Sequence, residues 1–477
     1  MNTFWTLGHK TELEEMLAGR ERRANTQRQM LMFCPGATLI CFTLNIAGPM
    51  KVTALTDEAF YEGVSAIEEA LTMAGISAES ETCEHPYGHE AYYVIENENA
   101  ESVKRLMVMI EEEHPLGRLF DIDVLQSNDA ELHSNANSEA QSGEELHKLS
   151  RADIGENERR CLICDEMAAV CASARAHSVS ELQEKTTQMI SDFLRDRGPT
   201  AGLISRMAYN SMLNEVATTP KPGLVDFANN GSHKDMTPDT FEKSAYAICD
   251  YFGDLFDMGF SNASEPEENL LAKSRPVGKA MENKMLDATE GVNTHKGIIF
   301  SLGLICLAWG YLEGQAYQGK ASRDDLTISN ILKTASKIAT PVKDEPNERG
   351  GGAREEALSG FKSITEIAIP AYDWAIEKKL DVNLCGVYSI MKLIGELEDT
   401  NMVARGGKDL AREMKEKARR ITAEFDGKDA DDFIKKVCLL EEEFIKNNLS
   451  PGGSADLLVI TIFLKMLEDI LPGPSPA

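Results

Sequence analysis

The sequence predicts two domains, an α/β domain followed by a domain built from helices alone. Three observations support this prediction. The chain has 477 residues, of which 42% are hydrophobic, so it is long enough to form two packed cores. Apolar residues in its first third alternate between strand-like and helix-like spacing, whereas strand signals nearly vanish further along. We therefore expect a first domain over residues 1–185 and a second domain over residues 186–477.

The expected first domain alternates helices with strands. Thr11 and Glu14 form a capping-box pattern, which predicts a helix that ends near Leu31. Runs of β-branched and apolar residues predict strands over 38–46, 91–95 and 119–125. Apolar residues at helical spacing predict helices over 60–71, 103–110 and 180–197. The polar, acidic stretch Ser127–Glu145 is expected to form a mobile loop.

The expected second domain consists of helices joined by connectors that contain glycine. These connectors are Pro220–Asp226, Gly291–Lys296, Gly350–Ala353 and Ser450–Ser454. The longest apolar stretch, Gly297–Leu312, contains Ser301 and lacks basic flanks, so it predicts a buried core helix rather than a membrane span. A last helix is expected over Asp456–Leu471.

The net charge of −29 excludes two classes of partner. Nucleic acids and anionic membranes both require a basic protein surface, so neither is expected to bind. A polyanionic substrate then needs local lysines and arginines, backbone N–H groups or a metal ion. The first residues include early acidic side chains and no long apolar run, which argues against a secretory signal. The ten cysteines fit reduced thiols in the cytoplasm.

Two carboxylates mark a candidate site in the first domain. Asp121 and Asp123 alternate with apolar residues on an expected strand, so both side chains share one face. Such a pair suits a hard divalent cation, here Mg²⁺, that bridges phosphate oxygens and helps pyrophosphate to leave. Arg118 lies close enough in the sequence to add charge stabilisation. A solvated strand end explains the same two aspartates equally well.

A second group combines thiols with an imidazole. It consists of Cys161, Cys164, Cys171 and His177, which are residue types that suit Zn²⁺. The spacing is not that of a standard zinc finger, and small cysteines pack well in alanine-rich helical sequence. The sequence therefore favours reduced structural cysteines over a zinc site.

Three stretches together resemble the apo-citrate lyase phosphoribosyl-dephospho-CoA transferase family, namely TLICFTLNIAGPMK, GRLFDIDV and RRCLICDEMAAVCASARAHS. The resemblance covers roughly residues 10–183 and implies a nucleotidyltransferase-like α/β fold. It implies that a serine of the apo-acyl carrier protein of citrate lyase, its gamma subunit, attacks the phosphorus nearest the ribose and that pyrophosphate leaves. Asp121 and Asp123 would then be the metal carboxylates.

Four clusters at the expected helix junctions mark a site in the second domain. They lie at 215–236, 289–297, 350–357 and 448–456. Their glycines expose backbone N–H groups ahead of helix N-termini, where oriented donors and the helix dipole bind phosphate. A helix cap is the simpler explanation of any single cluster. Four clusters that all carry charged or imidazole side chains favour one shared anion site.

These clusters, together with EDTNMVARGG at 398–407, resemble the triphosphoribosyl-dephospho-CoA synthase family over about residues 200–477. The implied reaction joins ATP to dephospho-CoA. The 2′-hydroxyl of dephospho-CoA attacks C1′ of the ATP ribose, adenine leaves and the triphosphate stays attached. Its product is the substrate implied for the first domain. One position departs from the resemblance, because Glu355 stands where a Gly-Ala-Arg-Gly-Glu run would have glycine.

The residue types in these clusters suggest binding roles. We expect Lys221, Lys296 and Arg354 to hold phosphates, since the acidic chain otherwise lacks positive charge. Asn293 and Ser454 are expected to bind the same ligand beside these cations.

Acid–base and metal roles are expected for the carboxylates and imidazoles. Asp235 and Glu356 are expected to hold Mg²⁺ on the triphosphate. The general base is expected to be Asp226 or His233. His295 is expected either to contact substrate or to be a core histidine.

Two other functions fit parts of the pattern. The anion clusters alone would suit a nucleoside glycosylase or a phosphoribosyl-type transferase with another acceptor. A non-catalytic scaffold that docks a carrier protein is the third interpretation, and the intact carboxylate and imidazole clusters argue against it.

Overall fold

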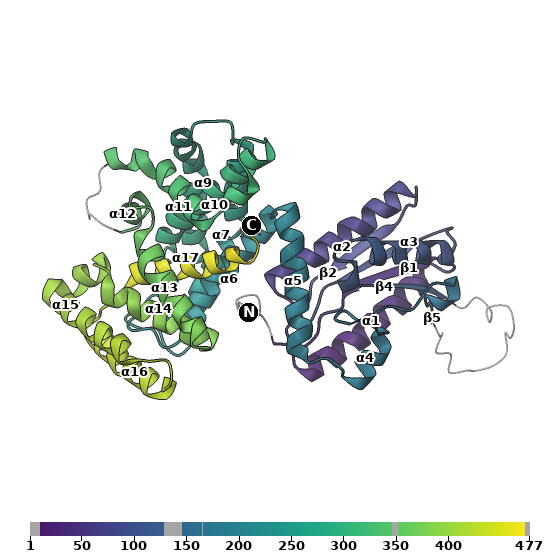
Figure 1. The fold of residues 1–477 in the computed structure, drawn as a ribbon, viewed down its shortest axis with the longest axis horizontal. Coiled ribbons are helices and arrows are strands. Elements are labelled where there is room, and N and C mark those ends of the chain that lie inside the picture. Colours follow the sequence, from purple (N-terminus) through teal and green to yellow (C-terminus); the bar gives the residue numbers. More distant parts are fainter. Residues whose placement is uncertain (1–9, 128–145, 165, 346–351, 473–477) are drawn as a thin grey trace. The chain divides into compact units, whose positions relative to one another are not determined.

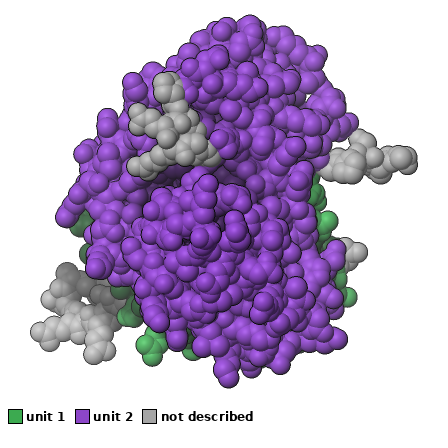
Figure 2. Space-filling model, turned by 90° about the vertical axis from the view of Figure 1, so that its left-hand side faces the viewer, with its two compact units in different colours: residues 1, 5–196 green, residues 2–4, 197–477 purple. Residues whose placement is uncertain are grey.

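The computed structural model describes residues 10–127, 146–164, 166–345 and 352–472. The described chain forms two compact units, which divide between Asp196 and Arg197 (Figures 1 and 2). Most of the expected mobile loop, 128–145, lies outside the described residues, as do Gly350 and Gly351.

The helix α5 (Val179–Arg197) contains the boundary that the sequence predicts at residue 185. The ring of Phe193, near the end of α5, lies 5.6 Å from the ring of His114 in the first unit. Gln183 donates from its side-chain amide to the carbonyl of Ala47. This helix therefore packs with the first unit, and the division between the units falls at its last residue.

The first unit is an α/β structure, as predicted. Its five-stranded sheet has the order β2-β3-β1-β4-β5, and every neighbouring pair is antiparallel. The strands are β1 (Thr38–Leu44), β2 (Glu79–Cys83), β3 (Glu90–Ile95), β4 (Phe120–Ser127) and β5 (Leu146–Lys148). The sequence did not predict the edge strands β2 and β5, because their residues are mostly polar and exposed.

Each face of this sheet carries its own core. Three helices that contact the sheet are α1 (Leu13–Phe33), α2 (Ala54–Met73) and α3 (Ala100–Glu113). Leu31 of α1 packs in one core with Leu39 of β1. On the opposite face, the ring of Phe42 lies 5.1 Å from that of Phe60 in α2 and 5.4 Å from that of Phe120. Side chains along β4 point alternately to the two faces, so Asp121 and Asp123 lie on the same face of the sheet as α1.

The start of α1 differs from the predicted one by a single residue. Glu12 is the N-cap, and it forms the capping box with Glu15 rather than Thr11 with Glu14. Thr11 is instead buried, and its hydroxyl donates to the carbonyl of Pro86. The pattern located the helix correctly, but tertiary packing selected the cap.

The second unit contains only helices among its described residues, as predicted. They are α6 (Ala201–Ala217), α7 (Pro238–Ile248), α8 (Asp250–Ser261), α9 (Glu267–Ala288), α10 (Lys296–Tyr317), α11 (Ile328–Ala339), α12 (Ala353–Leu358), α13 (Ile369–Glu377), α14 (Val382–Glu396), α15 (Thr400–Glu424), α16 (Ala430–Lys446) and α17 (Gly452–Glu468), with short 3₁₀ and π turns between some of them.

The central helix of this unit is α10, which contacts α8, α11 and α17 (Figure 1). In the described chain it is the helix whose length and hydropathy would suffice to cross a membrane. Of its most apolar window, 83% is buried inside the protein, as the sequence predicts for a core helix. Gly310 lets α8 approach closely, because a Cβ there would lie 1.9 Å from the carbonyl oxygen of Phe256.

Candidate functional site

The two aspartates of β4 lie side by side on the α1 face of the first sheet. Asp121 pairs with Thr43 of β1 and Asp123 pairs with Cys41. Nζ of Lys148 lies 2.6 Å from Oδ1 of Asp123. Burial, followed by the charge of Asp121, raises the pKa of Asp123. A cation shared by the two carboxylates would offset the repulsion between them.

A cavity of about 170 Å³ adjoins Asp121. Its wall includes the basic side chains of Arg20 and Arg23, from α1, and of Lys51. Burial and then the charge of Arg20 lower the pKa of Lys51, so cations are crowded here. This favours an anionic ligand. These residues were not among the predicted site residues, although the run Arg-Glu-Arg-Arg at 20–23 was a visible signal.

Arg118, which was expected to add charge stabilisation beside the two aspartates, contacts backbone carbonyls instead. Its Nη2 donates to the carbonyl oxygen of Arg160 at 3.0 Å and to that of Cys161. Arg159 is the arginine that approaches the aspartate, since its Nη1 lies 3.8 Å from Oδ1 of Asp121. Arg159 and Arg118 both line a separate cavity of about 540 Å³.

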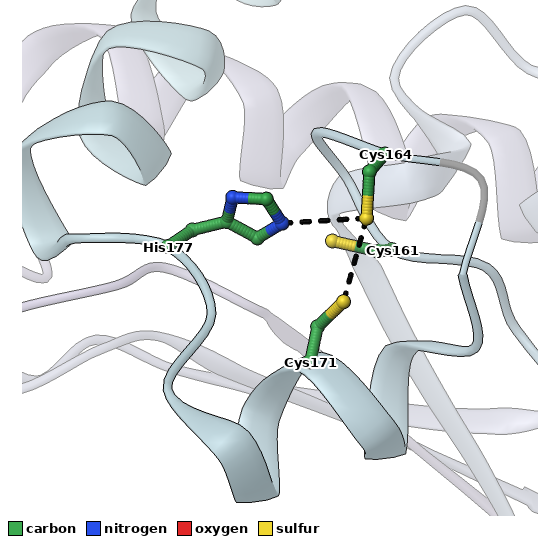
Figure 3. A group of neighbouring side chains, drawn as sticks. All are labelled: Cys161, Cys164, Cys171 and His177. Atoms are coloured by element: carbon green, nitrogen blue, oxygen red, sulfur yellow. Dashed lines mark hydrogen bonds between the residues drawn. The ribbon is translucent and has the colours of Figure 1, made fainter.

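The cysteine and histidine side chains of the second sequence cluster converge. Sγ of Cys164 lies 3.4 Å from Sγ of Cys171 and 3.3 Å from Nε2 of His177 (Figure 3). With Cys161, the four ligand atoms all lie within 4.8 Å of one another.

In the second unit, three of the four sequence clusters meet at one cavity of about 340 Å³. Residues from the loop before α7, from the start of α10 and from the start of α17 line it. Asn401 and Arg405, at the start of α15, complete the wall. Three helix N-termini therefore face one space, where their dipoles attract anions. Asp399 already accepts from the N–H groups of Asn401 and Ser454 at two of these helix starts.

A second cavity of about 390 Å³ adjoins the first. Asp456 lines both cavities. Gly452 lines the first cavity and Gly453 lines the second. The remaining sequence cluster, 350–357, reaches this second cavity through Glu355 and Glu356 of α12. Both volumes lie in the range of ordinary ligand pockets.

Asp456 is the most perturbed carboxyl group of this site. Burial, followed by the charges of Glu215 and Asp399, raises its pKa to about 8. Gly297 at the start of α10 makes room for it, because a Cβ at that position would lie 1.9 Å from Oδ2 of Asp456. The sequence analysis did not single out Asp456, Asp399 or Arg405, although all three lie in its motifs.

His233 and His295 both line the first cavity. Nε2 of His233 lies 2.8 Å from the hydroxyl oxygen of Ser450, and burial followed by the charge of Arg405 lowers its pKa. His295 is 3% exposed, and its Nδ1 lies 2.7 Å from the hydroxyl oxygen of Ser244. Burial lowers the pKa of His295 to about 3, so this imidazole is neutral.

Lys221 and Asp226 are fully buried and hold the loop before α7. Nζ of Lys221 lies 2.6 Å from Oε1 of Glu215. The carboxylate of Asp226 accepts hydrogen bonds from the backbone N–H groups of Lys221, Ala228 and Asn229. These contacts give both residues a structural role in shaping the loop.

The other predicted residues of this unit are dispersed around the cavities. Asn293 and Lys296 line the first one, and the side chain of Asn293 accepts from the backbone N–H of Lys296. Arg354 lines a different cavity of about 200 Å³, where its Nη2 lies 3.5 Å from Oε2 of Glu345. Ser454 is fully buried and is the third residue of α17.

The two predicted metal carboxylates do not share a cavity. The side chain of Asp235 is 64% exposed, and its Oδ1 lies 4.0 Å from Nδ1 of His233. Glu356 lines the second cavity, where its two oxygens accept from the backbone N–H and the hydroxyl of Ser363.

Comparison with known proteins divides the chain in the same way. A family model described as apo-citrate lyase phosphoribosyl-dephospho-CoA transferase matches residues 11–193. A second model, described as ATP:dephospho-CoA triphosphoribosyl transferase, matches residues 201–474.

Similar proteins span the whole chain or its second unit. Protein CitXG of Haemophilus influenzae is 33% identical over 97% of this chain and 97% of its own length. Protein CitXG of Leuconostoc mesenteroides subsp. cremoris is 28% identical over 96% of this chain and 98% of its own. A 2-(5''-triphosphoribosyl)-3'-dephosphocoenzyme-A synthase of Pectobacterium atrosepticum is 40% identical over 57% of this chain and 90% of its own. The chain therefore belongs to the CitXG family, fusions of an apo-citrate lyase phosphoribosyl-dephospho-CoA transferase with an ATP:dephospho-CoA triphosphoribosyl transferase.

Proposed function

We propose that the second unit joins ATP to dephospho-CoA with release of adenine. The 2′-hydroxyl of dephospho-CoA attacks C1′ of the ATP ribose, the bond to adenine breaks, and the triphosphate stays attached. The observation that carries this proposal is the meeting of three helix N-termini at one cavity, beside a carboxyl group that resists ionisation. N-termini suit the triphosphate, and a protonated carboxyl suits a departing base.

Proton transfer in this reaction needs a base and an acid. We assign the base to His233, which is kept neutral by its surroundings and takes the proton of the attacking hydroxyl. We assign the acid to Asp456, which is protonated at neutral pH and delivers a proton to adenine. Asp226 is a poorer base, because its oxygens already accept three backbone hydrogen bonds.

Magnesium bound to the triphosphate would neutralise charge in this unit. Asp235 fits it best, since its carboxylate is exposed beside the first cavity. Glu356 fits less well, because both of its oxygens already accept hydrogen bonds.

Adenine release tests this half of the proposal. The protein is incubated with ATP and Mg²⁺, with and without dephospho-CoA, and adenine is measured by chromatography. Adenine that appears only with dephospho-CoA supports the proposal. Adenine without the acceptor would indicate a nucleoside glycosylase, and none under either condition would indicate a non-catalytic scaffold.

We further propose that the first unit attaches the product to a serine of the citrate lyase acyl carrier protein. The serine oxygen forms a bond to the phosphorus nearest the ribose, and pyrophosphate leaves. Asp121 and Asp123 fit Mg²⁺ as an oxygen-donor pair on one strand face, in a nucleotidyltransferase-like arrangement. The basic cavity beside Asp121 suits the triphosphate end of the substrate.

Mass spectrometry of the apo-carrier tests this step. Its mass is expected to rise by the phosphoribosyl-dephospho-CoA group, and a carrier with serine replaced by alanine is expected not to change. Asp121→Asn should stop the gain while adenine release continues. Asp192→Asn, an exposed carboxylate on α5, is the matched control and should support the full gain. Loss of both activities in Asp121→Asn would contradict the division of labour.

A further inference from the structure

The cluster of Cys161, Cys164, Cys171 and His177 has no part in either proposed reaction. Its members come from a short segment around α4 (Ala168–Ala174), which follows the predicted catalytic strand β4 in the chain. The turn before α4 carries two of the cysteines, α4 carries the third, and the loop after it carries the histidine (Figure 3). All four side chains point toward one centre.

The spacing of these atoms matches one small metal ion. A tetrahedral zinc with Zn–S bonds of about 2.3 Å holds its sulfur ligands about 3.8 Å apart. The observed separations of 3.4 Å between two sulfurs and 3.3 Å between sulfur and imidazole nitrogen are close to that value. The backbone N–H of Ile163 also points at Sγ of Cys161, with a separation of 3.5 Å, which stabilises negative charge on the sulfur.

The surroundings of the cluster are not those of an apolar core. Cys161 and Cys171 are only 7% and 8% exposed, yet the neighbouring large apolar side chains face solvent. Their exposed fractions are 38% for Ile163, 47% for Met167 and 43% for Val170. A segment that buries its cysteines and exposes its apolar residues gains little from hydrophobic packing. It needs another source of stability, and in small lobes a metal supplies it.

We propose that Cys161, Cys164, Cys171 and His177 bind one Zn²⁺ as a structural Cys₃His site. Four protein ligands leave no open position, so this ion stabilises the fold and performs no chemistry on substrate. Binding displaces the thiol protons to solvent, and the thiolates and the neutral imidazole then bind the ion. The ion thereby fixes the two ends of the segment.

The zinc site would also position a residue of the proposed transferase site. Nη2 of Arg159, two residues before Cys161, donates to the carbonyl of Phe120 at 2.7 Å, and its Nη1 lies near Asp121. Arg118 returns a hydrogen bond to the carbonyl of Arg160. The segment and the start of β4 are therefore joined in both directions.

Metal content of the full-length protein tests this inference. The protein is purified under reducing conditions without chelator and analysed by inductively coupled plasma mass spectrometry. One zinc per chain is expected. Cys164→Ser and His177→Ala should each lose most of it, whereas Cys83→Ser, a half-buried cysteine outside the cluster, should keep it. A reduced protein that takes up no zinc from a zinc-buffered solution would overturn the proposal.

Two further measurements remain informative if a variant folds poorly. Wild-type protein reconstituted with Co²⁺ should show thiolate-to-cobalt charge-transfer bands and the intense visible bands of a tetrahedral site. Zinc should protect three thiols from alkylation, and mapping of the labelled residues after chelation should identify Cys161, Cys164 and Cys171. Protection of other cysteines, or a disulfide between Cys164 and Cys171 in protein purified without reductant and free of metal, would contradict a zinc site.

Discussion

Asp456 shows how the fold creates an acid from an ordinary carboxyl group. It lies near the start of α17, where the charges of Glu215 and Asp399 act on it, and its half-buried side chain lines both cavities. Its ionisation would add a third negative charge to this space. The proton that it retains is the one that we assign to departing adenine.

Adenine release should therefore depend on the protonation of Asp456. Since the pKa is about 8, kcat/KM of the wild-type enzyme is expected to fall as the pH rises above that value. Asp456→Asn should lower the rate about 10²- to 10⁴-fold, as is usual for loss of a general acid, and should abolish this alkaline limb. Asp426→Asn, an exposed carboxylate in the turn before α16, is the control. A wild-type profile that stays flat through pH 9 would contradict the assignment.

The same pKa shift makes a prediction about stability. The pKa of Asp456 is about 8 in the folded protein, against an ordinary value of 3.8, so between these pH values the folded state holds a proton that the unfolded state has lost. The contribution of this group to the free energy of unfolding is complete below pH 3.8 and declines as the pH rises toward 8. In Asp456→Asn the side chain does not ionise, so the free energy of unfolding does not decline for this reason. The variant should gain in melting temperature relative to wild type between pH 5 and pH 8, as measured by calorimetry.

His233 should control the acidic side of the same profile. Burial and Arg405 lower its pKa, so the neutral base is expected to persist below pH 6.5, the usual pKa of histidine. His233→Gln should reduce kcat about 100-fold or more, within the range for loss of a general base. Ser450→Ala removes only the hydroxyl that orients the imidazole and should have a smaller effect. Steady-state kinetics that show equal losses for the two variants would argue for a positioning role only.

At the scale of elements, α8 and α10 depend on glycine for their close contact. A methyl group at Gly310 would overlap the backbone of Phe256, whereas one at Gly278 in α9 would meet nothing within 4 Å. Gly310→Ala is therefore expected to destabilise the protein by about 1–3 kcal/mol or more through overpacking. Gly278→Ala, also inside a helix, should stabilise it by about 0.5–1 kcal/mol. Urea unfolding of both variants measures the difference, and equal effects would contradict the packing argument.

Elements with a strong periodic pattern were predictable from the sequence, and those without one were not. Apolar spacing located α2 and α3, and in the second unit α10 and α17, because burial of apolar side chains determines that spacing. It could not reveal β2, whose residues are polar and exposed. It also could not reveal the pKa of Asp456, since Glu215 and Asp399 lie far from it in the sequence. The sequence also could not say which cavity Arg354 lines, because charge type does not determine this.

At the scale of the whole molecule, each unit has its own core, and this predicts that the two activities can be separated. Chains of residues 1–196 and 197–477 should each fold and keep one activity. A chain that ends at residue 185 lacks the part of α5 that carries Phe193 and should melt at a lower temperature than residues 1–196. Circular dichroism and the two assays measure this. Equal melting temperatures would show that the end of α5 contributes nothing to the first unit.

The contact between Gly297 and Asp456 limits what position 297 of this chain can accept. A side chain there would push aside the carboxyl group opposite it. On the assignment of Asp456 as the acid, Gly297→Ala would weaken adenine release while leaving every titratable group in place. The reaction would then depend on an absent side chain as much as on those that are present.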